Sequence, residues 1–280
     1  MNEHLFRKAF FSKITVKISF VILCLFVIAA ITSSFIAPYD PAAISLTEKG
    51  MAPSLKHLFG TDLLGRDVLS RMLYGARVSL TISLVSVCIG GLTGMILGMI
   101  AGYFGGIVDT VICRCSDALI SIPSIVLTIA IGTALGQSTL NIMIAIGISS
   151  IPGNIRMMRS KVLTVRERDF ITSVKVIGAG NVRLMFKHLV PNSISPLIIS
   201  CAMGLGNAIM AESTLSFLGI GIKAPTPAWG SMVSDGMKSI VTQPWLSIIP
   251  GFAIMLIVLS FNIVGDALRD ALDPRIRGNI

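Results

Sequence analysis

The sequence predicts an all-α protein that crosses a membrane several times. Apolar residues make up 53% of its 280 residues and charged residues only 13%, whereas soluble domains carry about 25% charged residues. Several uncharged runs also reach the roughly 20 residues that a helix needs to cross the hydrocarbon layer. Together these observations exclude a soluble globule, a disordered chain and a disulfide-rich secreted domain.

The uncharged runs define the expected helices. Six spans are predicted, and in chain order they cover 18–37, 78–108, 118–135, 140–155, 189–218 and 239–265. The polar residues 136–139 separate the third span from the fourth, because Gly, Ser and Thr are typical of turns. The fourth span is the weakest, since it is short and contains Pro152. The first run is longer than the 7–15 residues of a typical signal-peptide core, so it is expected to be retained.

The distribution of basic residues predicts the topology. An even number of spans places both termini on one side, together with residues 109–117 and 156–188. These inner segments carry 16 of the 23 Lys and Arg residues, and the opposite side carries 7. Because Lys and Arg collect in cytoplasmic segments, both termini and the 156–188 loop are expected in the cytoplasm. The net charge of +9 therefore reports topology, and no nucleic-acid partner is expected.

Motifs for catalysis and cofactor binding are missing from the sequence. The chain contains no G-x-x-x-x-G-K-[ST] phosphate loop, no G-x-S-x-G and no H-E-x-x-H. Its cysteines and histidines do not form a cluster with zinc-ligand spacing. An enzyme, a metal site and a bound cofactor are therefore not expected, and the pattern favours a transport subunit that another protein drives.

The segment after the fourth span has its own internal pattern. Phe170, Val174 and Ile177 recur at i, i+4 and i+7, which places them on one face of a helix. Gly178 is expected to end this helix, and a second amphipathic stretch follows as far as Pro191. Two short helices outside the bilayer would expose apolar stripes, which another surface must cover. Their partner could be the membrane interface, the protein's own helices or a separate cytoplasmic subunit.

This segment resembles the "EAA" loop of ABC importer permeases, which reads E-A-A-x-x-x-G followed by an apolar-Pro pair. The aligned residues are 172–178, with Val190-Pro191 downstream; the glycine, the spacing and the proline match, but Thr172-Ser173-Val174 replaces Glu-Ala-Ala. Further segments resemble the same proteins, namely Phe59–Asp67, Gly75–Leu80, Glu212–Gly221, Pro225–Gly230 and Asn262–Asp270. Over nearly the whole chain, they resemble the "C"-type permease subunit of the dipeptide/oligopeptide/nickel ABC importer family.

The resemblance implies a type I permease fold in a bacterial inner membrane. Residues 76–268 would form the transmembrane domain with a coupling loop at 156–190, between an N-terminal region 1–75 and a cytoplasmic tail 269–280. The implied partners are a homologous permease, which completes a heterodimeric pore, two ATPase subunits and an extracytoplasmic solute-binding protein. The implied solutes are peptides or nickel and metal-chelate complexes. A self-sufficient secondary transporter is the alternative, and it would require intramembrane carboxylates for coupling ions.

The resemblance also implies roles for particular residues. The ATPase-coupling residues would be Arg168, Asp169, Phe170, Ile171, Thr172, Ser173, Val174, Gly178 and Pro191. Of these, Phe170, Ile171 and Val174 would enter a groove of the ATPase. The outer segments 38–77 and 219–238 would form the docking face for the binding protein.

Two further features follow from the residues themselves. Gly90, Gly94, Gly98 and Gly102 form a small-residue face at four-residue spacing, which could pack inside the subunit or at the heterodimer seam. Glu212 is an acid within an apolar run. It is a candidate either for a structural hydrogen bond or for the solute pathway.

Overall fold

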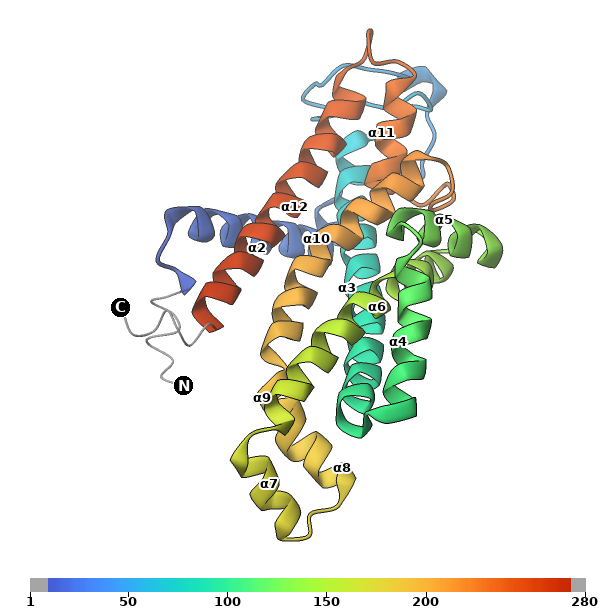
Figure 1. The fold of residues 1–280 in the computed structure, drawn as a ribbon. Coiled ribbons are helices and arrows are strands. Elements are labelled where there is room, and N and C mark those ends of the chain that lie inside the picture. Colours follow the sequence, from blue (N-terminus) through green and yellow to red (C-terminus); the bar gives the residue numbers. More distant parts are fainter. Residues whose placement is uncertain (1–9, 273–280) are drawn as a thin grey trace.

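The computed structural model describes residues 10–272, which form a bundle of helices without a β-strand (Figure 1). The all-α prediction is therefore confirmed. In chain order the elements are α2 (Ile14–Ile36), η1 (Leu46–Glu48), α3 (Val68–Phe104), α4 (Gly106–Ile120), α5 (Ser124–Leu135), α6 (Thr139–Arg166), α7 (Asp169–Val176), α8 (Asn181–Leu184), η2 (Met185–Leu189), α9 (Val190–Ser193), α10 (Ser195–Phe217), α11 (Trp229–Met237) and α12 (Trp245–Leu272).

The long helix α3 is the centre of the bundle. It packs against α6 along most of its length, while α10 lies against both α3 and α12. α2 packs at the side of α3 and α12. Figure 1 shows α7 and α8 at one end of the molecule and α11 at the other. After the roles and topology that the sequence predicts, we call the end with α7 and α8 the coupling end and the end with α11 the outer end.

Four described helices are long and apolar enough to span a membrane, namely α2, α3, α10 and α12. A fifth span results if α4 and α5 count as one, although they meet at an angle of 91°. α6 is not among them; its first 18 residues include Asn141, Pro152 and Asn154, and basic residues follow in its second half. The sixth span and the cytoplasmic location of the termini therefore stay predictions; residues 1–9 and 273–280 lie outside the described residues.

Two predicted boundaries are wrong. Residues 109–117 lie inside α4 rather than in a connection; the breaks fall instead at Gly105, between α3 and α4, and at 121–123, where Pro123 precedes α5. α6 also continues through Arg166, so the first part of the predicted 156–190 loop is helix. The helix continues because Met158, Val162 and Val165 recur at helical spacing and are buried.

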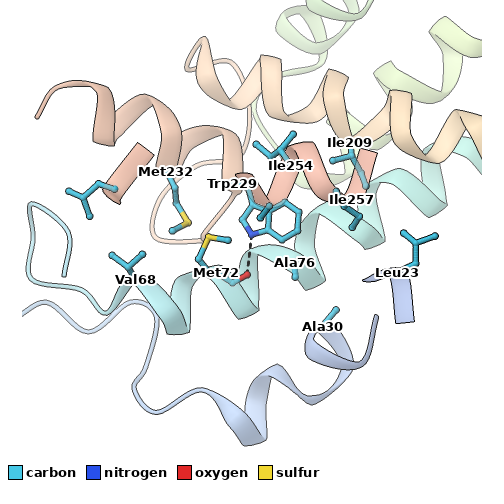
Figure 2. Packing of buried hydrophobic residues seen from close by; sticks show 12 residues of the cluster. Leu23, Ala30, Val68, Met72, Ala76, Ile209, Trp229, Met232, Ile254 and Ile257 are labelled. Atoms are coloured by element: carbon cyan, nitrogen blue, oxygen red, sulfur yellow. Dashed lines mark hydrogen bonds between the residues drawn. The ribbon is translucent and has the colours of Figure 1, made fainter. Parts of the chain in front are cut away.

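The outer end is held by a buried cluster around Trp229 (Figure 2). The indole nitrogen of Trp229 donates to the backbone oxygen of Met72 on α3 at 3.0 Å. Phe26 of α2 packs edge-on against the indole with ring centroids 5.5 Å apart. Since an indole buries up to about 250 Å² and needs a partner for its N–H, this cluster fixes α11 against α2 and α3.

Candidate functional site

The coupling end has a buried base and an exposed tip. Ile171 of α7 is 0% exposed and packs in a cluster with residues of α3, α6 and the α8–α9 region. The members of this cluster are Met99, Met158, Val162, Val165, Ile171, Leu184, Met185 and Leu189. Val174 packs against its edge. The prediction that Ile171 faces a partner is therefore wrong, because its side chain is enclosed by its own chain.

The exposed tip is apolar. The side chains of Val176 and Ile177 are 82% and 85% exposed, and Val182 across the glycine corner is 71% exposed. Phe170 and Phe186 are also exposed. We refer to these five residues as the apolar tip. Aliphatic side chains at this exposure gain nothing from the fold itself, and a contiguous apolar patch on a protein usually marks an interaction site.

Gly178 gives the tip its shape. Its φ of +85° lies in the left-handed region that favours glycine. Its N–H donates to the Lys175 oxygen at 2.9 Å, and the Ala179 N–H donates to the Val174 oxygen at 3.3 Å. This pair of bonds is a Schellman motif, which ends α7 and turns the chain toward α8. A side chain at Gly178 would meet nothing within 4 Å, so the backbone angle rather than close approach requires the glycine.

The polar residues predicted to contact an ATPase lie around α7. Arg168 occupies the N-cap position and Asp169 the first turn, where a negative charge suits the helix dipole. Thr172 and Ser173 are exposed, and the Ser173 hydroxyl donates to the Asp169 backbone oxygen at 3.0 Å. All four are accessible at the same end as the apolar tip.

Pro191 does not end the second amphipathic stretch, contrary to the prediction. The chain remains helical from α8 through a wide π-type turn at Met185–Leu189 into α9, in which Pro191 occupies the first turn. A proline fits the first turn of a helix because its missing N–H is not needed there. The side chain of Pro191 is exposed and lies near the base of the tip, not in it.

Polar contacts join the coupling end to α3. The guanidinium of Arg166 donates to the backbone oxygens of Gly102 and Tyr103 at 3.1 and 2.9 Å, which satisfies carbonyls at the end of α3. The Tyr103 hydroxyl donates to Asn181 at 2.7 Å, and the Lys175 ammonium lies 5.6 Å from the Tyr103 ring. The apolar tip is therefore mounted on α3 and α6 by both apolar and polar contacts.

A polar cavity of about 380 Å³ lies between α3, α5, α6 and α10, level with the middle of α10. We name it after its polar lining residues, which are Ser86, Ser124, Thr128, Ser149, Ser150, Asn154, Ser200 and Asn207, but apolar side chains such as Val87, Ile146 and Ala208 line it as well. Among the described residues, 10–272, no charged residue lines it. Several of these hydroxyls donate to backbone oxygens, as those of Ser86, Ser149 and Ser150 do.

The polar cavity is held by hydrogen bonds among its walls. The Thr128 hydroxyl on α5 lies 2.8 Å from the Ser149 hydroxyl on α6, and the Ser200 hydroxyl on α10 donates to Asn154 at 3.1 Å. Sequence reasoning missed this cavity because it searched for charged groups. The available signal was the helical spacing of Ser200, Gly204 and Asn207, which lie on one face of α10.

Glu212 lies outside the polar cavity and is 0% exposed. Its carboxylate accepts hydrogen bonds from Ser79 on α3 at 3.0 Å and from Ser216 at 2.8 Å, with Ser213 at 3.5 Å. This arrangement connects α10 to α3 inside the chain and matches the structural alternative more closely than the pathway alternative.

The four-glycine face of α3 lies against α6. A Cβ atom at Gly90 would lie 2.9 Å from the Gly147 oxygen, and one at Gly94 would lie 2.4 Å from Asn154 Cβ. Gly98 and Gly102 approach the backbone of α6 in the same way. The two helices are in direct backbone contact along this face, so it is occupied within the chain.

The sequence is similar to a family of known transport proteins. The model of the family "Binding-protein-dependent transport system inner membrane component" matches residues 94–278. The dipeptide transport system permease protein DppC of Alkalihalophilus pseudofirmus is 42% identical over 260 residues, which cover 93% of this chain and 86% of that protein. The glutathione transport system permease protein GsiD of Escherichia coli O6:K15:H31 is 40% identical, with 91% and 84% covered.

Similarity to solved structures supports the fold. The inward-facing MetNI methionine ABC transporter aligns with a TM-score of 0.58 at 16% sequence identity. The alignment covers 72% of this chain and 97% of that chain. At this identity the similarity speaks for the fold alone, which is that of an ABC importer permease.

Proposed function

The chain belongs to the family of binding-protein-dependent transport system inner membrane components, and on this premise we propose that it forms half of a pore that imports peptides. It is a multi-pass inner-membrane permease subunit of an ABC importer, and a self-sufficient secondary transporter is not supported. The other half of the pore would be a homologous permease. Two ATPase subunits would hydrolyse ATP, and an extracytoplasmic binding protein would deliver the solute.

The apolar tip is the proposed contact with the ATPase. Exposed aliphatic side chains at Val176, Ile177 and Val182 supply apolar area that a partner groove can cover. Phe170 adds an aromatic side chain at the rim. Arg168, Asp169, Thr172 and Ser173 would supply the polar edge of the same contact, in place of the Glu that the "EAA" pattern has at position 172.

Movement of the tip would reach the polar cavity through α6. Ile171 and Met158 join α7 to α6 at the coupling end, and Ser149 and Asn154 of the same helix line the cavity. A displaced tip would therefore carry the cavity wall with it, since packed helices shift as rigid elements. Closure of the ATPases on ATP would change which side the cavity faces.

The lining of the cavity supports a peptide solute. Hydroxyl and amide groups can exchange hydrogen bonds with peptide N–H and C=O groups, as water does. An uncharged lining would also pass peptides with different side-chain charges. The names of the relatives, which include dipeptide and glutathione permeases, point to the same class. Nickel and metal chelates receive no such support.

The high exposure of Ile177 and Val176 is the observation that carries the proposal, and an uncoupling variant tests it. We expect Ile177→Asp to lower co-purification of the ATPase and solute-driven ATP hydrolysis at least tenfold, because a buried unpaired carboxylate is costly. Val241→Asp is the matched control, since Val241 is 92% exposed at the outer end. Normal coupling in Ile177→Asp would contradict the assignment.

A further inference from the structure

A buried arginine at the outer end has little to neutralise it. The side chain of Arg71, in the first turn of α3, is only 5% exposed. Its Nη1 donates to the Pro41 backbone oxygen at 3.0 Å. Its Nε lies 3.6 Å from Asp62 Oδ2, which is too far for a hydrogen bond. A guanidinium offers five N–H donors. Within residues 10–272, the Arg71 guanidinium forms no hydrogen bond to a carboxylate.

The carboxylate of Asp62 already accepts hydrogen bonds from other donors. Its Oδ1 accepts from the backbone N–H groups of Leu64 and Arg66 at 2.8 and 3.0 Å. Its Oδ2 accepts from Arg66 Nε at 2.6 Å. The Arg66 side chain is itself only 9% exposed. Two buried guanidinium groups therefore share one carboxylate, which leaves a local excess of one positive charge.

A cavity of about 260 Å³ opens beside these side chains. Its charged lining residues are Asp62, Arg66, Arg71, Asp235 and Lys238, and Leu64 and Met232 are among its apolar ones. Asp235 pairs with Lys238 at 2.9 Å on the exposed side, so this pair adds no net charge. The space is large enough for a carboxylate side chain, and the charge beside it has the sign that attracts one.

We propose that this cavity receives an acidic side chain of the extracytoplasmic binding protein. A buried cation that shares its only nearby carboxylate with a second cation is costly, and a further carboxylate can bind a guanidinium through two parallel hydrogen bonds. The cavity is lined by residues of α11, which lies at the end opposite α7 and α8 (Figure 1), and it shares no lining residue with the polar cavity. This placement favours a docking partner over the solute. The inference rests on the proposed function, which supplies the partner.

The affinity of the binding protein for the reconstituted transport complex tests the inference. We expect Arg71→Gln to weaken docking at least tenfold and to reduce its dependence on salt. Arg114→Gln is the matched control, because Arg114 is an exposed cation on α4, outside the cavity and outside the outer segments 38–77 and 219–238. Its docking should change less than twofold.

A second variant covers the case in which Arg71→Gln does not fold. Leu64→Trp leaves every charge in place, and the indole, at a residue 41% exposed on the cavity wall, should fill the space. It should weaken docking to a similar degree. Wild-type docking by both variants would overturn the inference, as would normal docking with a raised KM for the solute, which would assign the carboxylate to the solute. A wild-type complex that docks no binding protein would overturn the proposed function as well.

Discussion

The two ends of the molecule differ in how they meet their surroundings. The coupling end presents aliphatic side chains to the outside, with Ile177 85% exposed, above a base in which Ile171 is fully buried. The outer end is held together by contacts such as Trp229 to Met72 and His57 to Asp67, although single aliphatic side chains such as Val241 are exposed there too. It also holds the buried Arg71 beside a cavity, with only a shared carboxylate near its guanidinium. The difference indicates an apolar contact at one end and an electrostatic contact at the other.

The largest effect is expected from disrupting the contact between α3 and α6, which connects the two ends. Gly94→Leu should prevent accumulation of folded protein, because even its Cβ would lie 2.4 Å from Asn154 Cβ on α6. Overpacking by single methylene groups already costs about 1–3 kcal/mol, and a whole side chain here must force two helices apart. Gly153→Leu is the control, since a Cβ at Gly153 meets nothing within 4 Å. Size-exclusion profiles of both variants test this prediction; equal yields would contradict it.

Substitutions within α7 should separate its base from its tip. Ile171→Ala should cost about 2–5 kcal/mol of stability, as for other buried Ile and Leu truncations. Ile177→Ala should change stability by less than about 0.5 kcal/mol, yet weaken ATPase binding. Thermal unfolding of the isolated permease and ATPase co-purification measure the two effects. If Ile177→Ala proved the more destabilising change, the division into base and tip would be wrong.

Salt should affect the two ends differently. Raising the ionic strength from about 0.1 to 1 M shortens the Debye length from about 10 to about 3 Å. Docking of the binding protein should therefore weaken about tenfold or more, while ATPase binding through the apolar tip should change less than about twofold. Titrations at both salt concentrations measure the two affinities. Equal salt dependence of the two affinities would contradict an electrostatic contact at the outer end and an apolar contact at the coupling end.

Substitution of Glu212 by Gln should have the smallest effect on transport, because its carboxylate has a structural role. Glu212→Gln keeps an acceptor for Ser79 and Ser216, so transport should be near normal and stability should fall by about 1 kcal/mol. Glu212→Leu should cost more, because it removes every acceptor for these buried hydroxyls. Transport assays in proteoliposomes measure the effect of both substitutions. A complete loss of transport in a stable Glu212→Gln variant would instead assign this carboxylate to the pathway.

Much of the fold could be predicted from the sequence. The long apolar runs that became α2, α3, α10 and α12 are unambiguous because hydropathy alone defines them. Gly178 could be recognised as the end of α7, since a left-handed residue after an amphipathic stretch favours glycine. The bend between α4 and α5 could not be located, because Pro123 lies inside a run that is apolar on both sides.

The face of α7 that is buried could not be predicted either. Phe170, Val174 and Ile177 match helical spacing, but Ile171 is also apolar, and in an eight-residue helix both stripes are possible. Only the position of α3 and α6 decides that Ile171 is buried and Ile177 exposed. The polar cavity and the Arg71 site likewise depend on side chains that lie far apart in the chain.

The most direct test follows the polar cavity while the tip is moved. Asn207→Cys, introduced after replacement of the five native cysteines, places a thiol on the cavity wall in the assembled importer. Its reaction with an impermeant thiol reagent should switch from one side of the membrane to the other when ATP is bound and hydrolysis is blocked. In the Ile177→Asp background this switch should be lost. Reactivity that never changes with ATP, or a switch that persists in Ile177→Asp, would contradict coupling of the tip to the cavity.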